Sequence, residues 1–231
     1  TADRNAAIGY YAGSAITVAE NTAIGNQAMI AATTGNYNTA VGCYALDAAV
    51  TGSSNTAVGH QALSSNTSGA NNIAVGKEAL EANTTADHNV AVGNVALHVN
   101  TTGTKNIAVG NYALQQCTTG DFNIGIGYNS LGGLTTGGQN IAIGDAALEP
   151  CTGDNNTACG FRASYANTSG NENTAYGQKS LYTNTVGDRN VAVGSWALYD
   201  YKPSSNEDSY NTAVGYHCIG NDTTGANNTA V

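Results

Sequence analysis

The sequence predicts an all-β fold, a parallel β-solenoid of about thirteen coils built from a chain of 231 residues. Three observations lead to this prediction. A pentapeptide, Asn-x-Ala-Val-Gly, returns along the whole chain; its residues alternate as those of a short strand do; and a turn motif closes each repeat. A repeat array of this kind is stabilised by contacts between neighbouring repeats, because it has no central core.

The asparagines that open the pentapeptide are almost evenly spaced. Successive steps are 16 residues, then seven of 17, then 16, 17, 17, 21 and 17. We therefore expect one repeat array over residues 1–231, with an insertion loop at residues 199–210, since insertions in solenoids become surface loops. The coils are expected to begin near Asn5, Asn21, Asn38, Asn55, Asn72, Asn89, Asn106, Asn123, Asn140, Asn156, Asn173, Asn190, Asn211 and Asn228.

With this Asn as position 0, positions +1 to +3 of each coil predict a strand. Position +1 is mostly β-branched, +2 is Ala or once Gly125, and +3 is mostly Val or Ile. Gly at +4 predicts a corner that needs positive φ or a close backbone approach. Ala-Leu at +7 and +8 predicts a second short strand, so that the solenoid has two sheets, and Thr-Thr-Gly predicts the closing turn. At about 4.8 Å per coil, the array would be a rod on the order of 60 Å long.

The Asn column predicts a ladder of stacked amides that hydrogen-bond from coil to coil, as in cross-β stacks. A turn-forming role for the same Asn is compatible with this prediction. The residues assigned to the structural ladder are Asn38, Asn55, Asn72, Asn89, Asn106, Asn123 and Asn140.

The faces of the predicted strand differ in what they can contact. Position +2 is confined to Ala or Gly, so it faces a tight space, whereas +1 and +3 point the other way and are largely apolar. One face can pack on the Leu column, which leaves an apolar stripe along the array. Such a stripe exceeds the few hundred Å² that a monomer exposes, so we expect identical chains to cover it.

The pentapeptide followed by x-x-Ala-Leu resembles the head repeats of YadA-like trimeric autotransporter adhesins, and similar repeats occur in phage and viral fibre proteins. The resemblance covers essentially the whole chain. It implies a left-handed, homotrimeric parallel β-roll that is extracellular, on a cell, filament or virion surface. The chain departs from that family in its period, since those heads use repeats of about fourteen residues, and it carries no neck, stalk or anchor motif.

Composition argues against several classes of partner. The net charge is −9 with seven Lys and Arg, so no basic stripe exists to bind nucleic acid or an anionic membrane. No apolar run approaches the roughly 18 residues of a membrane span, so we expect no membrane insertion in this segment. Cys117 and Cys151 lie close to two coils apart, roughly 10 Å at β spacing, which is too far for a disulfide.

The sequence predicts no catalytic, cofactor-binding or metal-binding residues, and we expect that the chain is not an enzyme. The four histidines occupy four different positions in the repeat, so stacking of equal positions does not bring them together; they are His60, His88, His98 and His217. Asp recurs at position −2, as in Asp87 and Asp154, where we expect an Asx-type turn role rather than calcium binding. No nucleophile elbow, P-loop or His-Glu-x-x-His pattern is present.

Variation between repeats is concentrated at positions +5 and +6 and in the insertion. Aromatic side chains there are candidates for contact with a glycan or protein on a host surface; ordinary packing between neighbouring rim side chains is the alternative. The candidate ligand-facing residues are Tyr44, Tyr112, Phe161, Trp196, Tyr199, Tyr201 and Tyr210.

Together these features predict a structural fibre or adhesin segment, a shaft or head displayed on a surface. The main alternative is a self-assembling extracellular filament subunit, in which identical chains stack end to end. The Thr-Thr columns raise ice binding as a weaker alternative. Sequons at Asn66, Asn83 and Asn100 would be glycosylated in a eukaryotic secretory route.

Overall fold

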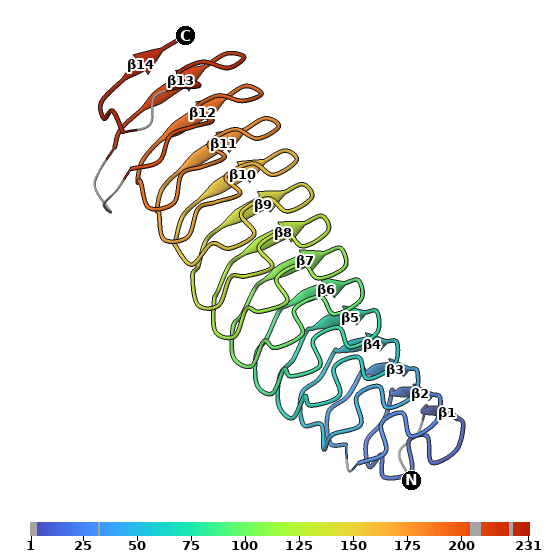
Figure 1. Cartoon of the computed structure of the whole chain (residues 1–231). Helices are drawn as coiled ribbons and strands as arrows, with labels where there is room; N and C mark the ends of the chain where they lie inside the picture. Colours follow the sequence, from blue (N-terminus) through green and yellow to red (C-terminus); the bar gives the residue numbers. More distant parts are fainter. Residues whose placement is uncertain (1–3, 32, 204–208, 222–223) are drawn as a thin grey trace. The chain divides into compact units, whose positions relative to one another are not determined.

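A computed structural model describes residues 4–31, 33–203, 209–221 and 224–231 of the chain (Figure 1). The chain divides into two compact units, Thr1–Thr119 and Gly120–Val231. Each unit is a parallel β-solenoid, and no helix occurs among the described residues. The predicted all-β, parallel solenoid class is therefore confirmed, whereas handedness and trimerisation stay predictions.

Each coil contributes one strand at positions +1 to +3. In the first unit the strands are β1 (Ala6–Ile8), β2 (Thr22–Ile24), β3 (Thr39–Val41), β4 (Thr56–Val58), β5 (Ile73–Val75), β6 (Val90–Val92) and β7 (Ile107–Val109). In the second unit they are β8 (Ile124–Ile126), β9 (Ile141–Ile143), β10 (Thr157–Cys159), β11 (Thr174–Tyr176), β12 (Val191–Val193), β13 (Thr212–Val214) and β14 (Thr229–Ala230).

Within each unit, every strand pairs in parallel with the next along the chain, and equal positions face each other. In the first unit Ala40 of β3 lies opposite Ala57 of β4. The register survives changes in coil length: Ala142 pairs with Ala158 across a 16-residue step, and Ala192 pairs with Ala213 across the insertion. Length changes are therefore confined to the turns, because a slip of one residue would turn every side chain to the other face.

The core of a typical coil is narrow and filled by small side chains and a Leu at +8, which other residues such as Met29 and Ser164 replace in some of the described coils. Ala57 at +2, Ala62 at +7 and Leu63 at +8 are all completely buried. The +2 position is completely buried in every strand from β2 to β7, whereas +1 and +3 are half-buried or exposed. The strand thus packs inward through its Ala and presents its larger apolar residues outward.

The predicted second strand is wrong. The Ala-Leu segment is a series of turns, because residues at +6 and +8 both take positive φ, as at Tyr44 (58°) and Leu46 (49°). A left-handed residue at every second position curls the backbone, so it cannot extend into a strand. Backbone bonds still join these turns from coil to coil: the N–H of Leu46 donates to the carbonyl of Ala62 at 3.1 Å. Each coil therefore has one sheet strand facing a wall of stacked turns.

The predicted corner at the +4 glycine is confirmed. These glycines have φ between 127° and 143°, a region that side chains other than Gly rarely enter. The backbones of adjacent coils also approach closely there: a Cβ added to Gly93 would lie 2.6 Å from the carbonyl carbon of Gly110. Both reasons for a glycine therefore hold at this position.

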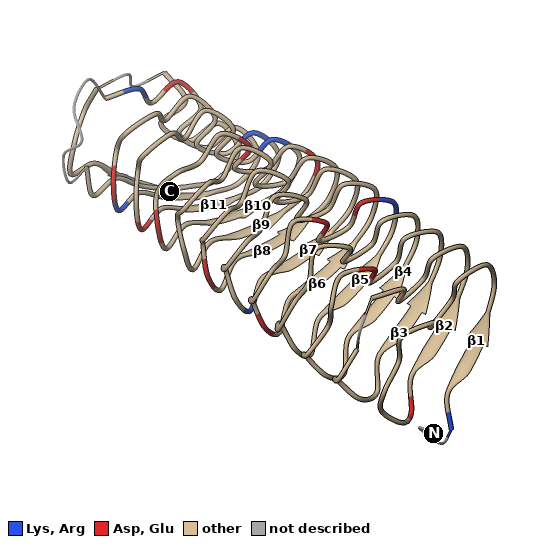
Figure 2. Ribbon diagram, turned by 90° about the horizontal axis from the view of Figure 1, so that it is seen from below, with Lys and Arg blue, Asp and Glu red and all other residues tan. Residues whose placement is uncertain are grey.

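In the part of the chain that the structure describes, charged residues lie on the turns and not on the strands (Figure 2). None of the described strands contains Lys, Arg, Asp or Glu. The outward face of the strands is therefore made of Thr, Val and Ile side chains, with Ala6 in the first unit and Cys159 and Tyr176 in the second.

Replacing Gly93 with Ala should lower the free energy of unfolding by about 2–4 kcal/mol, from backbone strain and collision with Gly110. Urea denaturation followed by circular dichroism would measure this. Asn94→Ala, at the next and half-buried position, is the matched control and should change stability by less than about 1 kcal/mol. Equal stability of the two variants would show that the corner tolerates a side chain.

Candidate functional site

The Asn at position 0 joins adjacent coils through both atoms of its amide. The Oδ1 of Asn38 accepts the backbone N–H of Asn55 at 2.9 Å, and the Nδ2 of Asn55 donates to the carbonyl of Gly69 at 2.8 Å. In the second unit, Asn123 and Asn140 repeat the first bond at 3.0 Å. Adjacent amides also bond directly, as from the Nδ2 of Asn55 to the Oδ1 of Asn38 at 3.2 Å.

These bonds explain why position 0 holds Asn. Each buried amide must accept from the backbone of one coil and donate to the backbone of another. Aspartate lacks the donor and Gly lacks both groups. Of the predicted ladder residues, Asn38, Asn55, Asn72, Asn89, Asn106, Asn123 and Asn140 are all at most 1% exposed.

A second column of buried amides lies at position +11, which the sequence reasoning did not assign. The Nδ2 of Asn83 donates to the Oδ1 of Asn66 at 3.0 Å and to the carbonyl of Ala86 at 3.2 Å. Asn100 continues the column, and its Oδ1 atom lacks a partner where Cys117 replaces the next Asn. The recurring Asn at +11 was the visible signal for this column.

The predicted glycosylation sites fall in this second column. Asn66, Asn83 and Asn100 are completely buried, and each Nδ2 atom already donates to a backbone carbonyl or a neighbouring amide. A glycan on any of them would displace these bonds and would not fit inside the coil. The folded solenoid therefore does not accept glycans at these three sequons.

Cys151 also lies in the +11 column and is completely buried. Burial raises the pKa of its thiol to about 12. The thiol therefore stays protonated at neutral pH and contributes packing rather than nucleophilic or redox chemistry.

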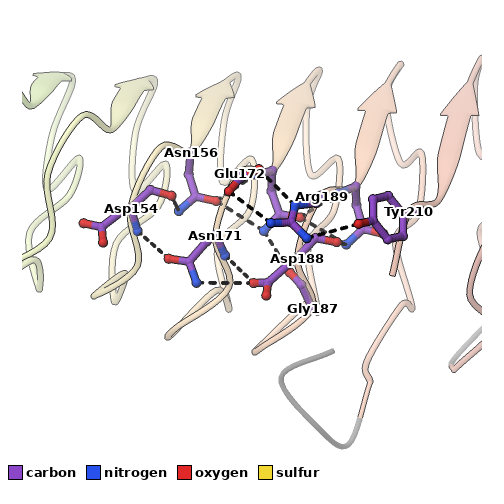
Figure 3. Close-up of polar contacts among 10 residues, drawn as sticks. Asp154, Asn156, Asn171, Glu172, Gly187, Asp188, Arg189 and Tyr210 are labelled. Carbon is purple, nitrogen blue, oxygen red and sulfur yellow. Dashed lines mark hydrogen bonds and ion pairs between the residues drawn. The ribbon is translucent and has the colours of Figure 1, made fainter. Parts of the chain in front are cut away.

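The acidic residues at position −2 form a third set of links between coils (Figure 3). A carboxylate oxygen of Asp154 accepts the backbone N–H of Gly138 at 2.7 Å, and one of Asp188 accepts that of Asn171 at 2.6 Å. The Oδ1 of Asn171 in turn accepts the N–H of Asp154 at 2.8 Å. The predicted Asx-type role places such bonds within one turn, whereas the observed bonds reach backbone N–H groups of the preceding coil.

Two residues at position −1 of adjacent coils form an exposed ion pair beside this column. The Nε of Arg189 lies 3.0 Å from a Glu172 carboxylate oxygen, and its Nη1 donates to the Tyr210 hydroxyl at 3.1 Å (Figure 3). Tyr210 is 48% exposed and has the guanidinium 5.7 Å from its ring centre. This candidate ligand-facing residue is therefore held on the surface by Arg189.

Among the candidates in the first unit, Tyr44 and Tyr112 are half-buried. Tyr44 packs edge-on against His60, with ring centres 6.3 Å apart. In the second unit, by contrast, the structure brings several aromatic rings together.

The rings of Tyr165, Tyr182 and Tyr199, all at position +9, stack along the second unit at 5.4 and 5.1 Å. Trp196 at +6 lies 4.4 Å from Tyr199, and the Lys179 ammonium lies 4.9 Å from Trp196. We call these residues the aromatic ridge: Arg162, Tyr165, Lys179, Tyr182, Trp196 and Tyr199. Phe161 contacts the ridge through Arg162, whose guanidinium carbon lies 5.1 Å from the centre of the Phe161 ring. Tyr at +9 in three successive coils was the signal missed in the sequence.

The aromatic ridge is half-buried, and its ring faces are occupied by each other and by cations. Cation–π contacts of this kind stabilise by about 0.5–1 kcal/mol at exposed sites. The charge of Glu149, which also accepts a bond from the hydroxyl, raises the pKa of Tyr165. An external ligand would therefore meet ring edges and hydroxyls rather than open aromatic faces.

Tyr201 is the candidate that the structure contradicts. It is 1% exposed and occupies the +11 column in the coil of Asn190, so it faces the interior rather than a ligand. Residues 204–208 of the predicted insertion loop lie outside the described residues. Of the other loop tyrosines, Tyr199 is in the aromatic ridge and Tyr210 contacts Arg189.

One group of potential metal ligands converges in the described part of the chain. It comprises Glu78 at +6, Glu81 at +9 and His98 at +9 of the next coil, and all three side chains are half-buried. A comparison of the repeat positions of the histidines alone cannot reveal this group, because it combines Glu with His and draws on two repeat positions, +6 and +9. His88 lies on an exposed turn and His217 near Trp196, at 6.5 Å between ring centres.

No protein-family model matches the chain, and a search of curated proteins finds no similar sequence. The described residues include no helix with the length and apolar character that crossing a membrane requires.

Replacing Asn72 with Asp should lower the free energy of unfolding by about 1–3 kcal/mol at pH 7, because its two Nδ2 donor bonds are lost inside the coil. Burial would raise the pKa of the new carboxyl above its unfolded value. The loss should therefore be smaller near pH 4 and grow as pH rises through the folded-state pKa.

Asn71→Asp provides the matched control for this measurement. Asn71 is exposed, and its positive φ of 59° suits Asp, so we expect little change at either pH. Chemical denaturation at both pH values would compare the variants. A pH-independent loss of stability in Asn72→Asp would contradict the buried-amide interpretation.

Proposed function

We propose that this protein is a structural segment of a surface-displayed fibre or adhesin, in which identical chains assemble side by side as a homotrimer. The observation that carries the proposal is the apolar stripe on the outward face of each sheet. The proposed location is extracellular, on a cell or virion surface, as the resemblance to adhesin head repeats implies.

The stripe consists of the +1 and +3 side chains. In the first unit Ile73 is 42% and Val109 is 36% exposed; in the second, Ile126 is 38% and Ile143 is 40% exposed. The same columns run through successive paired strands, and no described strand carries a charge to interrupt them. Continuous apolar surface of this kind is typical of sheets covered by a partner.

The hydrogen-bonded columns support a mechanical role. Within each unit, described coils are joined to their neighbours by backbone bonds, by the amides at position 0 and, in many coils, by Thr hydroxyls, as from Thr67 to the carbonyl of Thr84 at 3.0 Å. Bonds directed along the stacking direction resist separation of the coils. A shaft or head needs this property more than it needs a reactive pocket.

We further propose that the aromatic ridge is the part that contacts a glycan or protein on a host surface. It combines the cations Arg162 and Lys179 with tyrosine hydroxyls on the turn wall of the second unit. Loss of glycan-array or receptor binding on replacing Lys179 and Trp196 with Ala would support this role.

Introducing charge into the stripe should prevent assembly. The paired substitution Val75→Lys and Val109→Lys should convert a discrete trimer into a monomer, because burying two ammonium groups per chain against apolar partners costs several kcal/mol. Native mass spectrometry together with light scattering would measure the change.

Thr85→Lys with Gln116→Lys is the matched control, since both residues are exposed on turns away from the strands. We expect this variant to keep the wild-type mass. A wild-type chain that is monomeric at micromolar concentration would overturn the proposal, and a mass that grows steadily with concentration would indicate an end-to-end filament instead.

A further inference from the structure

Two adjacent coils of the first unit place an imidazole and two carboxylates at one point on the turn wall. The Nδ1 of His98 lies 3.1 Å from a carboxylate oxygen of Glu81, one coil before it in the same +9 column. Glu78 enters from position +6 of the same coil as Glu81. One ligand atom from each of the three side chains lies within 4.8 Å of the other two.

The local backbone explains this convergence. Glu78 has a φ of 57°, the left-handed conformation that recurs at +6 and turns the chain toward +9. The stack then places His98 directly above Glu81, and the N–H of Ala82 donates to the His98 carbonyl at 3.0 Å. The side chains of Glu78, Glu81 and His98 are 24%, 27% and 32% exposed, so solvent ions reach them while the backbone holds them in place.

The donor set fits a divalent transition metal. Carboxylate oxygen and imidazole nitrogen both bind Zn²⁺ at about 2.0–2.2 Å, which separates tetrahedral ligand atoms by about 3.3–3.6 Å. The observed separations, at most 4.8 Å, need to contract by no more than about 1.5 Å to reach this geometry, which rotation of the partly exposed Glu side chains can supply. A hard cation such as Ca²⁺ would instead require six or more oxygen ligands.

We propose that Glu78, Glu81 and His98 form a binding site for a divalent transition metal, with Zn²⁺ as the ion that suits the set best. The metal would take the Nδ1 lone pair of a neutral His98, whose proton then resides on Nε2, and one oxygen from each carboxylate. A water completes the fourth position. The site links two coils of the first unit and does not depend on assembly of the chain.

Neighbouring charges shape the site in opposite ways. The Lys77 ammonium lies 3.0 Å from a Glu78 carboxylate oxygen and competes with a cation there. A hydrogen bond from Lys77, together with the charges of Lys77, His98 and His60, lowers the pKa of Glu78. Asp47, whose pKa is raised by burial and in part by the charge of Glu81, adds negative charge from the same +9 column.

Isothermal titration calorimetry of the whole chain with ZnCl₂ tests this proposal. We expect saturable binding of one Zn²⁺ per chain, weakened at least about tenfold by His98→Gln or by Glu81→Gln. Lys77→Gln should bind Zn²⁺ several-fold more tightly, because it frees the Glu78 carboxylate. His88→Gln, which removes an exposed His elsewhere in the same unit, is the matched control and should bind as the wild type does.

A second measurement locates the ion. Nitrogen-15 NMR of the imidazoles should show a zinc-dependent shift of His98 Nδ1, with His88 and His217 unchanged. Thermal melting without metal should show all four variants folded. The proposal is overturned if the wild type shows no saturable binding, if His98→Gln retains wild-type affinity, or if the shift occurs at another histidine.

Discussion

Hydrogen bonding between stacked coils is the constraint on which the rest of the structure depends. Each coil directs backbone N–H and carbonyl groups toward its neighbours, so every position must repeat the conformation of the same position in the next coil. The repetition is strong enough to hold even unfavourable residues in place. Val95, which is β-branched, keeps a φ of 60° at position +6, a conformation that costs about 1–2 kcal/mol.

The same constraint explains the polar interior. Columns of buried Asn at positions 0 and +11 satisfy turn carbonyls and N–H groups that a purely apolar core would leave unpaired. These amides also fix the register. Across the insertion, the N–H of Asn211 still donates to the Oδ1 of Asn190 at 3.2 Å, so four extra residues are accommodated without disturbing the column.

Positions outside the fixed columns are where the two units differ. At +6 and +9 the first unit gathers Glu78, Glu81 and His98, whereas the second gathers Tyr, Trp, Arg and Lys in the aromatic ridge. Because equal positions stack, a single side chain becomes part of a ladder or cluster as soon as the next coil supplies a partner. The solenoid is therefore a scaffold on which surface chemistry is set coil by coil, while the interior varies less, chiefly in the +11 column.

From the amino-acid sequence alone we predict the coil boundaries, the strand at +1 to +3, the glycine corner and the inward Ala. Each of these follows from a periodicity or from a residue with narrow conformational range. The folded chain was needed to show that the Ala-Leu segment forms turns, that Tyr201 is buried, and that the side chains of Glu78, Glu81 and His98 converge. These features depend on positive φ at residues other than Gly and on contacts between different repeat positions of adjacent coils. Aligning the repeats position by position does not reveal either of them.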